Sequence, residues 1–241
     1  MRDEYLVDKI NYRGYVIRIE QDSYPMSPDE WDNLCSRACW HRNYTLSSND
    51  VETRTDNRDK KVEYYFGEPE EFQQFCKDNK VLVMNLRLYD HSGITISVSN
   101  EYPYNDRWDS GQVGWIFVTY ENIRKEYGVK KVTKKVLEEA QSRMLTEVET
   151  FDNYLTGSVY GFRIVKENEE DADFDPMDNL DSCWGFYGRE GIKDAVDQAK
   201  GSIDFEIKKQ RKEHSEKIKM WIRSKVPLEY REPMNKLFYN Y

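Results

Sequence analysis

Apolar and polar residues alternate along three stretches of the chain, 15–20, 81–88 and 94–99. A period of two is typical of strands that bury one face. The second and third stretches are separated by a short polar segment, so they predict a hairpin that turns at residues 90–93. A continuous apolar run at 115–118 is typical of a strand covered on both faces, and we expect it at the centre of the sheet.

A helix-start signal follows the first strand. Ser27 can cap a helix, Pro28 suits its first position and Glu30 completes a capping box. Apolar residues then recur at helical spacing, which predicts a helix over residues 27–40. The next stretch, 43–61, is polar and has no period, and it is therefore predicted to be a loop.

Further helices are predicted where apolar residues recur every three to four positions. One begins at Pro69, and another, at 121–127, ends at Gly128, since glycine readily adopts the left-handed conformation that ends a helix. Thr133 can cap a longer helix. The longest helical pattern covers residues 192–226 at the C-terminal end of the chain.

With further strands expected at 159–165 and 183–187, the pattern predicts an α+β fold, in which helices pack on a largely antiparallel sheet and a long amphipathic helix follows. We expect a core domain at 1–190 and the helix with its tail at 191–241. Residues 208–225 carry eight basic and two acidic side chains. A helix of this length either packs across the sheet or projects as an arm, through which copies of the chain could assemble into a scaffold.

Composition narrows the classes of partner. The chain has a formal net charge of −9, which on average repels nucleic-acid phosphates and argues against direct nucleic-acid binding. A basic or neutral partner fits better. No apolar stretch is long enough for a membrane span, and the first residues lack the apolar run of a signal peptide, so we expect a cytoplasmic protein with no membrane partner.

The four cysteines show no paired spacing, which fits reduced thiols in a cytosol. Cys35 and Cys39 are one helical turn apart in the predicted helix, and His41 follows them. Zinc normally needs four ligands, and the second half of such a set is missing, so we expect no metal and no cofactor. Buried thiols that pack as small apolar groups are the simpler interpretation.

Two blocks rich in turn-forming residues, 89–95 and 108–114, flank the predicted strands. Chain reversals would place them at one end of the sheet, where loops often carry function. Neither block matches a catalytic or phosphate-binding signature.

Within these blocks, consecutive residues such as Asp90, His91 and Ser92 cannot form a catalytic triad, because neighbours in a tight turn do not align in one hydrogen-bonded line. A dispersed site stays open as an alternative. In it Cys183 would be the nucleophile, His91 the base and Asp109 the residue that orients the base, as in a small hydrolase or transferase. Otherwise these residues stabilise the turns.

Aromatic residues beside the blocks offer a surface for protein recognition, because aromatic side chains dominate interface hot spots. The residues concerned are Trp108, Trp184 and Tyr104. Packing in the core is the alternative for each ring.

The segment 167–181 has eight carboxylates and no basic residue. The binding residues that we expect in it are Glu169, Glu170, Asp171, Asp173 and Asp175. The spacing of Asp171, Asp173 and Asp175 resembles the opening of a calcium loop, but Pro176 stands where the turn needs glycine and Ser182 where a bidentate Glu is needed. We therefore expect a solvated acidic loop.

Seven motifs together resemble a family of proteins that bacterial phages and other mobile elements carry. They are SPDEWDNL at 27–34, CWHR at 39–42, YDHSGIT at 89–95, WDSGQVG at 108–114, IRKEYG at 123–128, EVETFDNYLTG at 147–157 and SCWGFYG at 182–188. The resemblance covers about residues 14 to 188. It implies that the gene belongs to a phage or another mobile element, and it assigns no catalytic residue.

Accessory genes of phages often act against host defence. Because an excess of carboxylates can occupy a basic nucleic-acid channel in place of phosphate, the hypothesis that follows is an acidic anti-defence inhibitor. Its partner would be a host defence protein or ribonucleoprotein complex, such as a CRISPR or restriction effector. The hydrolase or transferase and the oligomeric scaffold are the alternatives.

Overall fold

The structure, a computed structural model, describes residues 5–56, 62–98, 106, 108–167, 179–225 and 227. It confirms the α+β class, with antiparallel sheets, packed helices and a long C-terminal helix. The chain divides into two compact units. The first comprises Met1–Gln21, Tyr160–Phe186 and Glu190–Tyr241, and the second comprises Asp22–Val159 and Tyr187–Arg189. This partition differs from the contiguous division at residue 190 that the sequence suggested.

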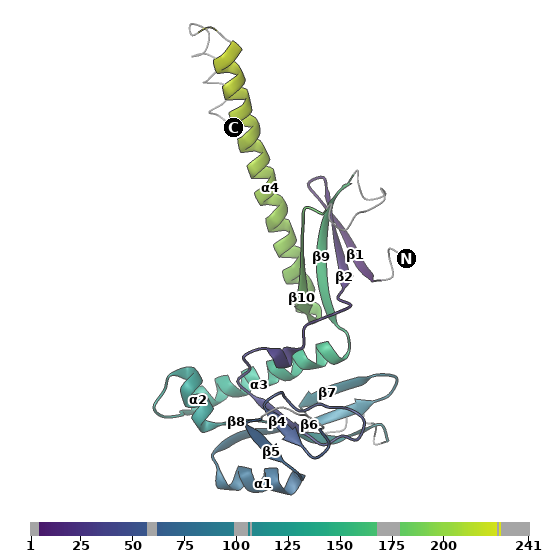
Figure 1. Cartoon of the computed structure of the whole chain (residues 1–241), viewed down its shortest axis with the longest axis vertical. Helices are drawn as coiled ribbons and strands as arrows, with labels where there is room; N and C mark the ends of the chain where they lie inside the picture. Colours follow the sequence, from purple (N-terminus) through teal and green to yellow (C-terminus); the bar gives the residue numbers. More distant parts are fainter. Residues whose placement is uncertain are drawn as a thin grey trace. The chain divides into compact units, whose positions relative to one another are not determined.

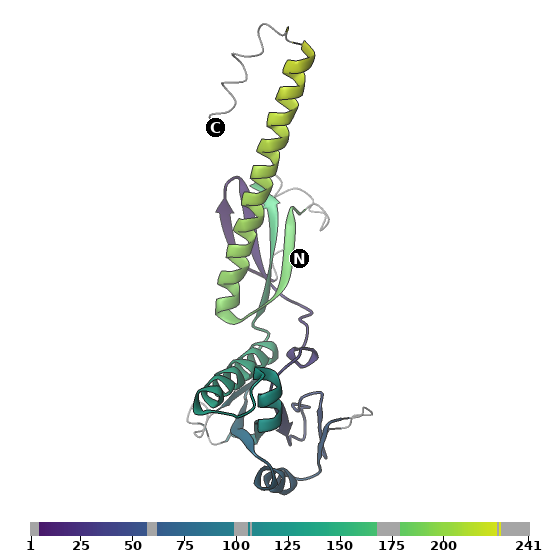
Figure 2. The same ribbon diagram turned by 90° about the vertical axis from the view of Figure 1, so that its left-hand side faces the viewer.

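The first unit is a four-stranded sheet with one helix on a face (Figures 1 and 2). The strand order is β1-β2-β9-β10, with bounds Leu6–Tyr12, Tyr15–Gln21, Val159–Lys166 and Asp181–Tyr187. The helix, α4, runs from Gly188 to Lys225 without a break at Gly201. The strands predicted at 15–20, 159–165 and 183–187 are therefore confirmed, whereas β1 carries too few apolar residues to show in the sequence pattern.

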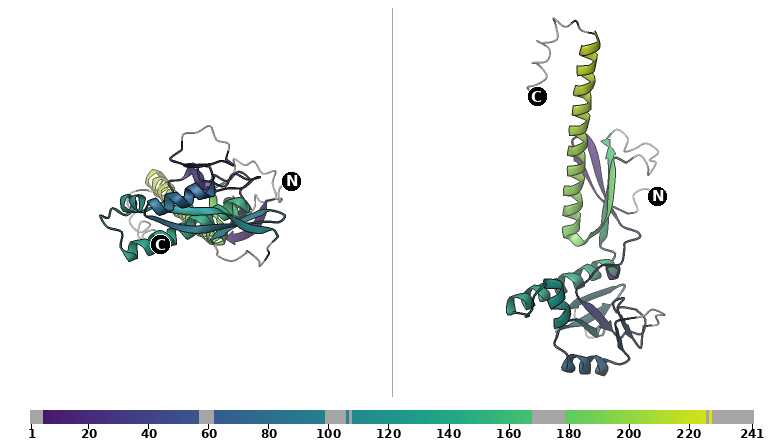
Figure 3. Two further views of the ribbon diagram at one scale, coloured as in Figure 1. Left: turned by 90° about the horizontal axis from the view of Figure 1, so that it is seen from below. Right: turned by 60° about the vertical axis from the view of Figure 1, so that its left-hand side comes forward.

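Alternation along β2 explains how the sheet receives α4. Ile17 and Ile19 point to one face, where they pack with Ala195, Ala199 and Ile203 of the helix. Each of these side chains is fully buried. The N-terminal half of α4 lies along the sheet, and Figure 3 shows the same arrangement from other sides.

The second unit has a sheet of order β3-β8-β6-β7, with bounds Ser36–Cys39, Ser110–Thr119, Val81–Asp90 and Ile94–Val98. The predicted hairpin is confirmed, since Asp90 pairs with Ile94. The apolar run at 115–118 lies in β8 between β3 and β6, so the expected central position is also confirmed.

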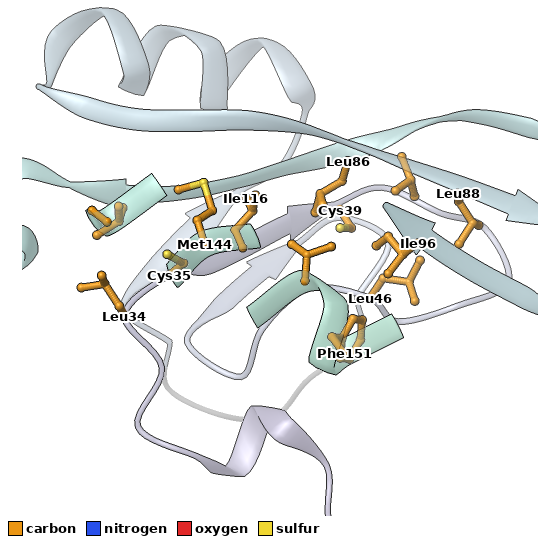
Figure 4. Packing of buried hydrophobic residues seen from close by; sticks show 14 of the residues in the cluster. Leu34, Cys35, Cys39, Leu46, Leu86, Leu88, Ile96, Ile116, Met144 and Phe151 are labelled. Atoms are coloured by element: carbon orange, nitrogen blue, oxygen red, sulfur yellow. The ribbon is translucent and has the colours of Figure 1, made fainter. Parts of the chain in front are cut away.

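Helices and a small sheet cover the two faces. Helix α3 (Lys134–Leu155) packs its Met144 and Phe151 on the same apolar cluster as Leu86 and Ile116 of the sheet (Figure 4). On the other face, Phe117 contacts Phe72 of α1. The remaining elements are α1 (Pro69–Asp78), α2 (Tyr120–Tyr127) and the parallel pair β4 (Val51–Thr53) and β5 (Tyr64–Phe66). Burial on both faces explains why β8 reads as a continuous apolar run.

The helix predicted at 27–40 is wrong. Ser27 does cap, accepting a hydrogen bond from the amide of Asp29 (3.3 Å), but only the 3₁₀ turn Pro28–Glu30 follows. Residues Ser36–Cys39 form β3, which pairs antiparallel with β8. Ala38 and Cys39 accordingly enter different apolar clusters on opposite faces. Pairing with β8 has overridden a local helix signal.

The loop predicted at 43–61 is wrong in part for the same reason. It contains β4, whose Val51 and Thr53 are buried. A strand of three residues is too short to reveal a period in the sequence.

Candidate binding site

Three of the sequence motifs meet at one edge of the second sheet. β8 is antiparallel to both β3 and β6, so the start of β8 lies beside the ends of the other two strands. A cavity of about 390 Å³ opens there, and we call it the Trp108 pocket. Its lining includes His41, Arg42, Asp90, Trp108, Asp109 and Gln112. This volume lies within the ordinary range for ligand and side-chain pockets.

Gly114 lets the third motif reach the pocket. A Cβ atom at this position would lie 2.0 Å from the carbonyl oxygen of Ala38 in β3. Only glycine therefore allows β3 to approach β8 closely, and β3 leads directly into Trp40, His41 and Arg42. Gly111, in the same motif, has open space around the position of a Cβ atom.

Trp108 is held by its backbone and not by its ring. The carboxylate of Asp106 accepts hydrogen bonds from the amides of Trp108 (2.7 Å) and Asp109 (3.3 Å), and the Ser110 hydroxyl donates to the Asp106 carbonyl. The Trp108 side chain is 95% exposed. Core packing, the alternative for this ring, is thus excluded.

His91 and Asp109 form a pair at the rim of the pocket. Nδ1 of His91 lies 2.8 Å from Oδ2 of Asp109, and the amide of Asp90 donates to the Asp109 carbonyl (2.8 Å). Because a carboxylate only accepts, Nδ1 carries the hydrogen of this contact. The His91 side chain is 63% exposed.

A second histidine lies across Asp90. The Tyr44 hydroxyl donates to Oδ1 of Asp90 (3.2 Å), and the His41 ring stacks on Tyr44 with 5.0 Å between centroids. The amide of Asn43 donates to Nδ1 of His41 (3.3 Å). Desolvation lowers the pKa of His41 and Arg42 acts in the same direction, while Asp90 acts against them. His41 is therefore neutral at pH 7.

The thiols expected near this histidine pack in the core. Burial raises the pKa of Cys39 to about 12 and also raises the pKa of Cys35, beside which the Glu147 carboxylate acts in the same direction. Neither thiol ionises at neutral pH. In the part of the chain that the structure describes, no group of three or more His, Cys, Asp or Glu side chains is placed to hold a metal ion.

The other expected site residues are placed as follows. Cys183 and Trp184 lie on β10 of the first unit, whereas His91, Asp109 and Trp108 belong to the second. The Trp184 ring covers Gly161, with the Arg163 guanidinium 5.2 Å from its centroid, and is 37% exposed. Tyr104, Glu169, Glu170, Asp171, Asp173 and Asp175 lie outside the described residues.

The structure places His91 and Asp109 in contact, and it adds Arg42 and Tyr44, to which the sequence assigned no role. Arg42 belongs to the motif CWHR, which the sequence analysis had singled out. The prediction of a helix over 27–40 gave no reason to place this motif at the edge of a sheet.

Comparison with protein-family models, with curated proteins and with solved structures finds no match for this chain. None of the helices in the described segments is long and apolar enough to cross a bilayer. The function is therefore inferred below from the side chains of the Trp108 pocket.

Proposed function

We propose that this chain is a phage or mobile-element accessory protein that binds and inhibits a host defence complex acting on nucleic acid. The observation that carries the proposal is the Trp108 pocket, an open polar cavity beside a fully presented indole ring. Large exposed aromatic rings are typical anchors of protein interfaces. The net charge of −9 and the resemblance to proteins of mobile elements support a basic partner in that context.

The carboxylates of the pocket favour an arginine or lysine of the partner. Asp90 uses Oδ1 for Tyr44, and Asp109 uses Oδ2 for His91, so each keeps a second oxygen that accepts no hydrogen bond from the described residues. A guanidinium group can stack on an indole and donate to a carboxylate at the same time. Arginine and lysine line the channels that hold nucleic-acid backbones.

Charge that does not line the pocket would act on the rate of association. Carboxylates of residues 167–181 would attract a basic channel over about a Debye length, roughly 8 Å at physiological salt. Arg42 limits the negative charge at the pocket itself, which favours one basic side chain over a cluster of them.

The direct test is Trp108→Ala in a phage plating assay on hosts that carry single restriction or CRISPR systems. Loss of a hot-spot anchor costs about 2 kcal/mol or more, so the affinity for the target should fall roughly 30-fold and protection should fall with it. Tyr24→Ala is the matched control, because Tyr24 is also 95% exposed in the second unit. Full protection by Trp108→Ala, or no protection by the wild-type protein against any system, refutes the proposal.

A second experiment tests the acidic segment 167–181 apart from the pocket. Glu169, Glu170, Asp171 and Asp173 are replaced by Gln or Asn, and binding to the inhibited complex is followed by stopped flow. We expect slower association, with a difference from wild type that shrinks as salt rises. An unchanged association rate would leave the pocket as the binding determinant and remove the acidic segment from the proposal.

The second candidate function is a small hydrolase or transferase, and the His91–Asp109 pair favours it. A carboxylate that orients a histidine leaves Nε2 as a general base. The readout is stoichiometry, since an inhibitor acts at a fixed ratio to its target and an enzyme turns over. If Cys183 were the nucleophile of that base, His91→Ala should slow alkylation of Cys183 by iodoacetamide; we expect an unchanged rate.

A further inference from the structure

The C-terminal half of α4 differs from the rest of the chain in charge. The apolar cluster that joins α4 to its sheet includes helix residues from Ile192 to Ile207, and Gln210 donates to the Tyr15 hydroxyl (3.4 Å). Residues 208–225 then continue as helix past the strands for ~27 Å at 1.5 Å per residue (Figures 1 and 3). They hold eight basic and two acidic side chains.

Most of these basic side chains share one side of the helix. Lys208, Lys212, Lys219 and Arg223 are separated by four, seven and four residues, the spacing of one helical face. Lys209 and Arg211 flank them, and the six together lie within about 160° of one another at 100° per residue. We call these six residues the α4 basic face. Ile203, which packs on the sheet, lies on the opposite side, and Ile207 lies one turn from Arg211 beside the edge of the face.

The face is mostly open to solvent. Lys208, Lys209, Arg211 and Lys212 are exposed, as is Arg223. Of the two acidic residues in 208–225, Glu216 lies within this sector and Glu213 lies beyond it. The average acidity of the chain, which argued against nucleic-acid contact, therefore does not apply to this helix, because the field near a surface follows the local charge.

We propose that the α4 basic face binds the phosphate backbone of double-stranded DNA without regard to sequence. The major groove of B-DNA admits an α-helix, and the deep, narrow major groove of an RNA duplex does not. Lysine, the commonest residue of the face, contacts phosphates as a point charge and does not select bases. Two exposed apolar residues of this half, Met220 and Trp221, are consecutive and therefore lie about 100° apart, and neither falls within the sector of the α4 basic face.

This contact is independent of the Trp108 pocket and lies in the other unit. A protein that binds both a defence complex and DNA would be concentrated on the DNA on which such complexes act. The two proposals fail separately, since one depends on Trp108 and the other on lysines of α4.

The test measures binding of a labelled DNA duplex to the full chain between 50 and 200 mM salt. A variant carries glutamine at Lys208, Lys209, Arg211 and Lys212. Each phosphate contact contributes about 0.9 to the slope of log affinity against log salt, so four lost contacts lower the slope by about 3.6. Over this fourfold change in salt the wild-type protein should lose about 150-fold more affinity than the variant.

The matched control carries glutamine at Lys130, Lys131, Lys134 and Lys135, four exposed basic residues of the second unit. It has the same net charge as the test variant and should bind DNA as the wild type does. Glutamine keeps helix propensity close to that of lysine, and circular dichroism verifies the helix. An equal loss in both variants, or no DNA binding by the wild-type protein at 50 mM salt, refutes the proposal. Tighter binding to duplex RNA, or equal competition by poly-glutamate, refutes it as well.

Discussion

The buried Arg37–Asp29 pair should be the most sensitive electrostatic contact of the second unit. The Arg37 side chain is 3% exposed; its Nε donates to the Leu46 carbonyl (3.2 Å), Nη2 donates to Asp29, and the guanidinium carbon lies 3.6 Å from the Phe151 ring centroid. Asp29→Ala leaves this cation buried without its anion. Such a loss costs about 3–5 kcal/mol, because desolvation is no longer offset.

At about 3 °C per kcal/mol for a unit of this size, the midpoint of thermal unfolding should fall by roughly 10–15 °C. Differential scanning calorimetry and urea titration measure the change. The control is Arg54→Met, which breaks an Arg–carboxylate pair with Glu68 at 2.7 Å whose side chains are 69% and 48% exposed. An exposed pair contributes at most about 1 kcal/mol. Equal destabilisation by the two variants would refute the assignment of Arg37 as a buried, paired charge.

Further outcomes follow from the same unit. Gly114→Ala should cost about 1–3 kcal/mol or more by forcing β3 away from β8, and Gly111→Ala, with open space around it, should be near neutral in urea titration. The pKa of His41 is lowered from 6.5, so as the pH falls the unfolded chain takes up a proton before the folded chain does. The free energy of unfolding should therefore fall as the pH drops below 6.5. His41→Gln should flatten that part of the stability–pH profile. Mass spectrometry after iodoacetamide treatment at neutral pH should find Cys39 unmodified in the folded protein and Cys183 modified, and fast labelling of Cys39 would contradict its burial.

Elements with strong local signals were predictable. The hydroxyl of Thr133 accepts from the amide of Val136 at the start of α3, and Gly128 ends α2 in the left-handed conformation, as their sequence positions indicated. The hairpin followed from a period of two, and the central strand followed from a continuous apolar run. These signals act over a few residues, so a single sequence contains them in full.

The elements that were missed depend on distant partners. β3 exists because β8 pairs with it, although its own sequence favours a helix start. The same error hid one side of the Trp108 pocket, since His41 and Arg42 reach it only when β3 is a strand. A buried Arg37 could not be foreseen either, because its counter-ion and its carbonyl acceptor come from two separate loops.

The interleaving of the two units sets an order of events during synthesis. Residues Asp22–Val159 stand between β2 and β9, two strands that pair from Tyr15 with Lys166 to Gln21 with Tyr160. The hairpin of β1 and β2 leaves the ribosome first, yet it has only its own two strands until the inserted unit has been translated. At typical elongation rates that delay is roughly 10–30 s, during which β2 has no partner strand on its second edge. A fragment that ends at residue 159 should therefore already display the Trp108 pocket, while its first strands still lack β9.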